Sequence, residues 1–75
     1  MNSDDELEQR MLAAHERSDK GALVDIYIEI ADRAAQSQDI DAECFFLTHA
    51  WIFALDSDHP LRDDLQKRLS AHGRV

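Results

Sequence analysis

The chain has 75 residues, and 16 Asp and Glu face eight Lys and Arg, which gives a formal net charge of −8. This length allows one small domain, and the acidic charge argues against direct binding to the phosphate backbone of nucleic acid, which needs a basic surface. The hydrophobic fraction of 44% is too high for a disordered acidic tail.

The first predicted helix spans about residues 4–17. Ser3 and Glu6 have the spacing of a capping box, in which each side chain satisfies a backbone amide of the first turn. The apolar stripe of this helix is thin, so we expect it to be the least stable part of the fold. The stripe consists of Leu7, Met11 and Ala14, with Leu12 to one side.

The second predicted helix spans about residues 20–37, with Asp19 as the expected N-cap. Its apolar side chains fill a broad arc of the helical wheel, wider than one neighbouring helix needs. The stretch from Val24 to Ile30 also alternates like a β-strand. The helical pattern continues through Ala34 and Ala35, however, and Ala favours a helix.

The third predicted helix spans about residues 39–56, with Asp39 as its N-cap. From Cys44 to Leu55 only Thr48 and His49 are polar, which is typical of a helix that is buried on several sides. It therefore forms the centre of the fold or part of an interface. We expect one side to face a neighbouring helix and to bury Trp51. This side consists of Ile40, Cys44, Leu47, Trp51 and Leu55.

The fourth predicted helix spans about residues 60–72, with Pro60 in its first turn and Gly73 at its C-terminal end. Its stripe of Leu61, Leu65 and Leu69 covers one neighbour. The short turns between the helices predict antiparallel neighbours. The predicted fold class is therefore all-α, with four antiparallel helices in one domain, arranged as a helical-hairpin array or a small bundle.

The segment of about residues 22–60 resembles a tetratricopeptide-type helical hairpin in its spacing of aromatic, large and small residues. The matching positions are Tyr27, Ile30, Ala31 and Ala34 on the first helix, the acidic turn Asp39-Ile40-Asp41, Leu47 and Ala50 on the second helix, and the closing Pro60. The chain departs from the pattern at Glu43, where a small residue is expected, and at Gln38, where the turn glycine falls. Pro60 comes about one helical turn late, and one repeat is visible. The resemblance implies a protein- or peptide-binding module rather than an enzyme.

Two groups of residues have metal-binding chemistry, and the sequence favours structural roles for both. Cys44 and His49 are separated by about 140° around a helix and do not share a face. We expect Cys44 in the core and His49 bonded to a neighbour. Asp56, Asp58 and His59 cluster at a helix junction and have side chains that can bind a divalent ion, but helix capping and solvation are the favoured interpretation. We expect no catalytic residue, metal or cofactor.

The aromatic residues of the third helix are the main candidates for function. Phe45, Phe46 and Phe53 lie across the wheel from Trp51, and the flanking helices offer only narrow stripes to cover them. The pattern leaves open whether they are ordinary core or an exposed surface for association. The candidate interaction surface consists of Tyr27, Ile28, Phe45, Phe46, His49 and Phe53.

These observations predict a small non-catalytic protein–protein interaction module, an adaptor or regulatory subunit with a protein or peptide partner. A homo-oligomeric structural protein that uses the same surface is the alternative. An acidic mimic of nucleic acid ranks last, because the acids are spread over every helix. No apolar run approaches the roughly 18 residues of a membrane span, and the acidic first 20 residues do not resemble a secretion signal. The lone Cys44 fits a reducing compartment, so we expect a cytoplasmic protein.

Overall fold

The computed structural model describes the backbone of residues 3–74 and the side chains of residues 6–74. This part of the chain forms four α-helices and no strand: α1 (Ser3–Glu16), α2 (Lys20–Gln36), α3 (Ile40–Asp56) and α4 (Arg62–Ala71). The predicted all-α fold class is therefore confirmed. The predicted capping box includes the side chain of Ser3, which lies outside the described residues.

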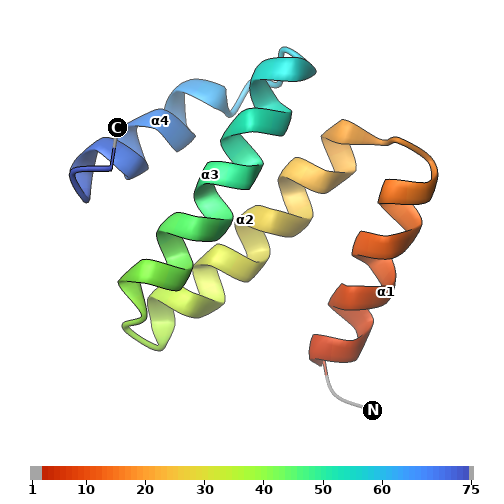
Figure 1. Cartoon of the computed structure of the whole chain (residues 1–75), viewed down its shortest axis with the longest axis horizontal. Coiled ribbons are helices and arrows are strands. Elements are labelled where there is room, and N and C mark those ends of the chain that lie inside the picture. The colour runs from red at the N-terminus through yellow and green to blue at the C-terminus, as the bar shows by residue number, and fades with distance from the viewer. Residues whose placement is uncertain (1–2, 75) are drawn as a thin grey trace.

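The helices lie side by side in chain order (Figure 1). Each packs against its neighbours in the chain: α1 on α2, α2 on α3, and α3 on α4. The first three alternate in direction, and α4 crosses α3 obliquely (Figure 1). The array is flat, because its Cα atoms extend over 33 × 29 × 14 Å. The contact between α2 and α3 is the most extensive, so this antiparallel hairpin is the centre of the fold.

All four helices end in the same way. The residue after each C-cap has a positive φ: Ser18 (53°), Gln38 (61°), Asp58 (52°) and Gly73 (72°). The following amide donates to the carbonyl five residues earlier, which is the Schellman arrangement that satisfies the last carbonyls of a helix. In the first three helices this carbonyl belongs to an alanine, at positions 14, 34 and 54.

The beginnings of α2 and α3 are capped as predicted. The Asp19 carboxylate accepts the Ala22 amide at 3.1 Å, and the Asp39 carboxylate accepts the Ala42 amide at 3.1 Å. The predicted start of the last helix is wrong by two residues. Pro60 lies in a turn and α4 begins only at Arg62, because the Arg62 amide bonds to the carbonyl of His59, three residues earlier.

The core lies mainly between α2 and α3. Several alanines let these two helices approach closely, and α1 and α4 each add two buried residues from one side. The fully packed residues include Val24, Ala31, Leu47, Ala50 and Ala54 from the central hairpin, Leu7 and Ala14 from α1, and Leu65 and Leu69 from α4.

The predicted burial of Trp51 is wrong in degree. Cys44 and Leu47 are buried, but Trp51 is only partly buried against the core, and Ile40 and Leu55 are each 50% exposed. The reason is that α3 meets its neighbours mainly through Leu47 and small residues. The ten-residue α4 buries only two leucines, so it is too short to cover the whole stripe.

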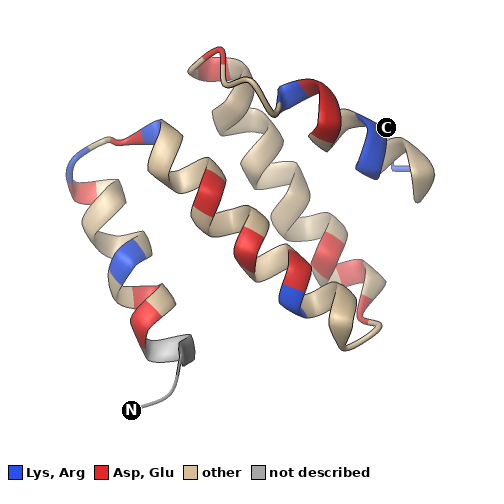
Figure 2. Cartoon of the chain, turned by 180° about the vertical axis from the view of Figure 1, so that it is seen from behind, with Lys and Arg blue, Asp and Glu red and all other residues tan. Residues whose placement is uncertain are grey.

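Charged residues occur on all four helices, with acids along α2 and at the start of α3 and residues of both signs on α4 (Figure 2). The described helices include none long and apolar enough to cross a membrane.

Candidate functional site

Tyr27 of α2 is the centre of an aromatic cluster. Its ring stacks on the rings of Phe46, His49 and Phe53, with centroids 6.2, 5.5 and 5.8 Å away. Residues 46, 49 and 53 share one face of α3 because their spacing follows the helical period. The structure therefore brings together four of the six residues of the candidate interaction surface. Tyr27 itself is only 9% exposed, so its ring forms the buried side of this cluster.

His15 of α1 completes the cluster, and the sequence analysis missed it. Its Nε2 lies 3.3 Å from the Tyr27 hydroxyl, and its ring meets Phe53 edge-on at 6.0 Å. The signal was available, because His15 follows Met11 by four residues on the thin stripe of α1. Through this contact the C-terminal half of α1 reaches α3 across α2.

The remaining two predicted surface residues make no ring contact with Tyr27: Phe45 borders the cluster, and Ile28 packs against the core. Phe45 is 57% exposed and meets Phe46 edge-on at 5.2 Å and His49 at 4.5 Å. Ile28 is partly buried and packs against the core. The His49 Nδ1 donates to the Phe45 carbonyl at 2.9 Å, which is the structural bond expected for this histidine.

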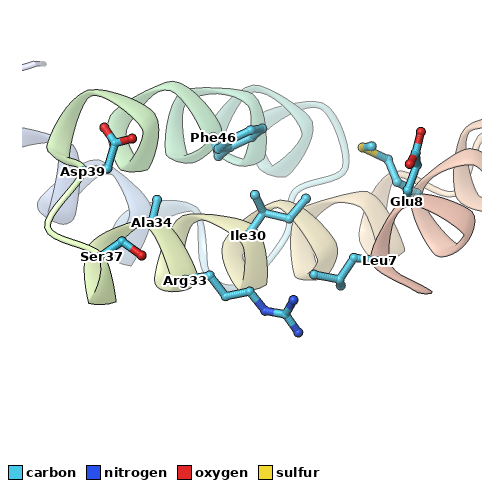
Figure 3. Close-up of a pocket in the computed structure, with 9 residues that line it drawn as sticks. Leu7, Glu8, Ile30, Arg33, Ala34, Ser37, Asp39 and Phe46 are labelled. Carbon is cyan, nitrogen blue, oxygen red and sulfur yellow. The ribbon is translucent and has the colours of Figure 1, made fainter. Parts of the chain in front are cut away.

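A groove of about 440 Å³ runs between α1 and the central hairpin. In Figure 3, Ile30 and Ala34 of α2 point toward Phe46 of α3, and Leu7 enters from α1. The residues that line it are Leu7, Glu8, Met11, Ile30, Arg33, Ala34, Ser37, Asp39 and Phe46.

The groove has an apolar interior and a charged rim. Met11, Ile30 and Phe46 are only partly buried, so their side chains remain accessible from the groove. Glu8 and Asp39 place carboxylates at the edge, and Arg33 extends away from Phe46 (Figure 3). Phe46 both lines the groove and stacks on Tyr27, so the groove and the aromatic cluster are continuous.

The three polar residues at the junction of α3 and α4 each have a separate partner. Asp56 pairs with Lys20 at 3.6 Å, and Asp58 pairs with Arg62. His59 accepts the Leu61 amide at Nδ1, and its Nε2 faces Asp25 at 3.7 Å. Cys44 is buried, as expected of a core residue. Within residues 6–74 no three His, Cys, Asp or Glu side chains gather as a metal site would require.

Comparisons of the chain with protein-family models, with curated proteins and with solved structures give no match.

Proposed function

We propose that this protein is a small non-catalytic interaction module, an adaptor or regulatory subunit, that binds a segment of a protein partner in the groove between α1 and the α2–α3 hairpin. One observation carries the proposal: the groove combines accessible apolar side chains with a rigid aromatic support. Ligand sites of this kind are concave, mostly apolar and largely preformed.

The contacts behind the groove support a binding role. Phe46 stacks on Tyr27, and Tyr27 is held by the hydroxyl contact to His15. An aromatic ring that is already fixed loses little conformational entropy on binding, so more of the contact energy appears as affinity. A bulky apolar side chain of the partner would displace water from Met11, Ile30 and Phe46.

The charge of the chain favours a partner segment with basic residues beside its apolar anchor. Glu8 and Asp39 lie at the groove rim, and the net charge is −8. Complementary charge mainly raises the rate of association and the specificity.

We further propose that the α2–α3 hairpin is tetratricopeptide-like. Three features support this: the extensive antiparallel contact of the two helices, the burial of Leu47 and Ala50, and the positive φ of Gln38 at the position of the turn glycine. A cytoplasmic location is also proposed, on the basis of the free buried thiol of Cys44.

Peptide selection tests the groove. A phage-displayed library of random peptides is selected on the full chain, and the enriched peptides are measured against Ala34→Leu. Ala34 is a partly buried residue of the groove wall, so the larger side chain fills the groove without introducing a charge. We expect enriched peptides to carry a large apolar residue with basic neighbours. They should bind the Ala34→Leu variant at least about tenfold more weakly than the unchanged chain, which corresponds to 1.4 kcal/mol.

The matched control is Ala71→Leu. Ala71 is exposed at the end of α4, away from the groove, so the same substitution should leave peptide affinity unchanged. A library without enrichment, or peptides that bind the two variants equally, would argue against the groove as the binding site.

A further inference from the structure

The outer face of α3 carries an apolar seam that the described helices leave open. Phe45, Ile52 and Leu55 are 57%, 51% and 50% exposed, and Thr48 lies between them, partly buried. The positions 45, 48, 52 and 55 alternate in steps of three and four. This is the spacing of the residues that meet a second helix in a coiled coil.

The seam also contains a hollow of about 300 Å³ at its N-terminal end. Four of the residues that line it come from α3: Asp41, Cys44, Phe45 and Thr48. Their spacing is i, i+3, i+4 and i+7, which is the set of four residues that receives one side chain of a facing helix. Arg74 lines the same hollow from the end of the chain.

We propose that this seam binds a second copy of the chain, with the two α3 helices antiparallel and Leu55 of each copy seated in the hollow of the other. In this register Phe45 faces Leu55 of the copy, and Thr48 faces Ile52 of the copy. The same helix supplies both the inserted side chain and the hollow. A single twofold axis therefore places Leu55 of each copy in the hollow of the other, and the assembly closes as a dimer.

The acids at the two ends of the seam are each paired within their own copy, so neither is left as an uncompensated charge at the interface. Arg74 Nη2 donates to Asp41 at 2.6 Å near the start of α3, and Lys20 lies 3.6 Å from Asp56 near its end. The antiparallel arrangement is favoured by the helix dipoles, which oppose one another there, whereas a parallel dimer would align the two dipoles unfavourably.

The seam shares no lining residue with the groove of the proposed function, so the dimer and the partner-binding groove are tested separately. The first test is the mass of the full chain in solution, by light scattering after size exclusion over a range of micromolar concentrations. We expect twice the chain mass of 8.6 kDa. A mass of 8.6 kDa at the highest concentration would overturn the proposal.

The variant Leu55→Glu removes the inserted side chain at a half-exposed position. It should reduce the mass to that of one chain while the helical circular dichroism is retained. The matched control is Leu12→Glu, because Leu12 is 55% exposed on α1, outside the seam. Loss of the dimer in both variants, or in neither, would argue against this surface.

Cross-linking tests the register independently of the stability of those variants. In a Cys44→Ala background, Phe45→Cys chains are mixed with Leu55→Cys chains and oxidised. The mixture should form disulfide-linked dimers. Each variant alone should not, because in a dimer of identical chains the two introduced thiols, one from each copy, lie about 15 Å apart along the helices. Efficient cross-linking of Phe45→Cys chains with one another, or none in the mixture, would overturn the antiparallel register.

Discussion

Arg68 of α4 and Glu43 of α3 form a pair that fastens the last helix to the central hairpin. The Arg68 Nη2 lies 3.0 Å from Glu43 Oε2, and Nη1 of the same guanidinium lies 2.9 Å from Asp32 of α2. Glu43 is only 6% exposed, and His72 Nε2 lies 3.3 Å from its other oxygen. One arginine thus joins three helices.

We predict that Arg68→Ala destabilises the fold by about 1–3 kcal/mol, because it leaves a buried carboxylate without its main partner. The loss should be smaller than that of a fully buried pair, since the Arg68 side chain is 34% exposed. Urea denaturation followed by circular dichroism measures this loss.

Arg62→Ala is the control for this prediction. Arg62 pairs with Asp58, whose side chain is 80% exposed, so its removal should change the stability by less than about 1 kcal/mol. The double variant with Glu43→Leu and Arg68→Ala should recover part of the loss, because neither charge remains. Equal effects of the two arginine substitutions would contradict the role given to Glu43.

The backbone of Gln38 predicts a stabilising substitution. Gln38 has a φ of 61°, a conformation that glycine adopts without the steric cost that a β-carbon imposes. Gln38→Gly should therefore raise the free energy of unfolding by about 0.5–1 kcal/mol and shift the thermal midpoint upward.

Gln36→Gly is the control for the effect of the positive φ at position 38, because Gln36 is an exposed residue of nearly the same place in the chain but is the last residue of α2. There glycine should lower the stability by a similar amount, since the position is helical. A destabilising Gln38→Gly would mean that the unfolded-state entropy of glycine outweighs the strain in this turn.

Local patterns predicted the helices well, because the signals that begin and end them lie within a few residues. Asp19 and Asp39 cap as expected, and Gly73 follows the last helix. The late start of α4 escaped prediction, because it depends on a turn bonded through the His59 carbonyl.

The candidate site was harder to predict than the helices, because it depends on which faces meet in space. The helical wheel placed Phe46 and Phe53 on one side of α3, and the structure stacks both on Tyr27. The same wheel does not indicate which neighbour covers a helix that is apolar all round. For that reason the exposure of Leu55 and the role of His15 in the cluster were not predicted.

Deletion of residues 1–17 tests the independence of the central hairpin. Among the described residues, the backbone of α1 packs only against α2, and α1 buries Leu7 and Ala14 there. We predict that the shortened chain stays helical but is less soluble, because the deletion uncovers apolar residues of α2 and removes three net negative charges. Circular dichroism and the saturating concentration measure the two effects, and complete unfolding would show that α1 is essential to the core.

Phe53 and Phe45 of α3 should respond differently to the same substitution. Phe53 is partly buried and stacks on Tyr27 while meeting His15 edge-on, whereas Phe45 is 57% exposed. Phe53→Asp should therefore destabilise the domain by at least about 3 kcal/mol, since it removes a packed ring and places a carboxylate against the core. A chain of this size has a total stability of about 4–11 kcal/mol, so much of the helical signal should be lost at moderate temperature.

Phe45→Asp makes the same chemical change on the same helix at an exposed position. It should leave the helical circular dichroism nearly unchanged, while it weakens the association of two copies through the seam. Comparing the unfolding curves and solution masses of the two variants therefore distinguishes folding from association. A folded, monomeric Phe53→Asp variant would instead place Phe53 at an interface and would contradict its assignment to the aromatic cluster around Tyr27.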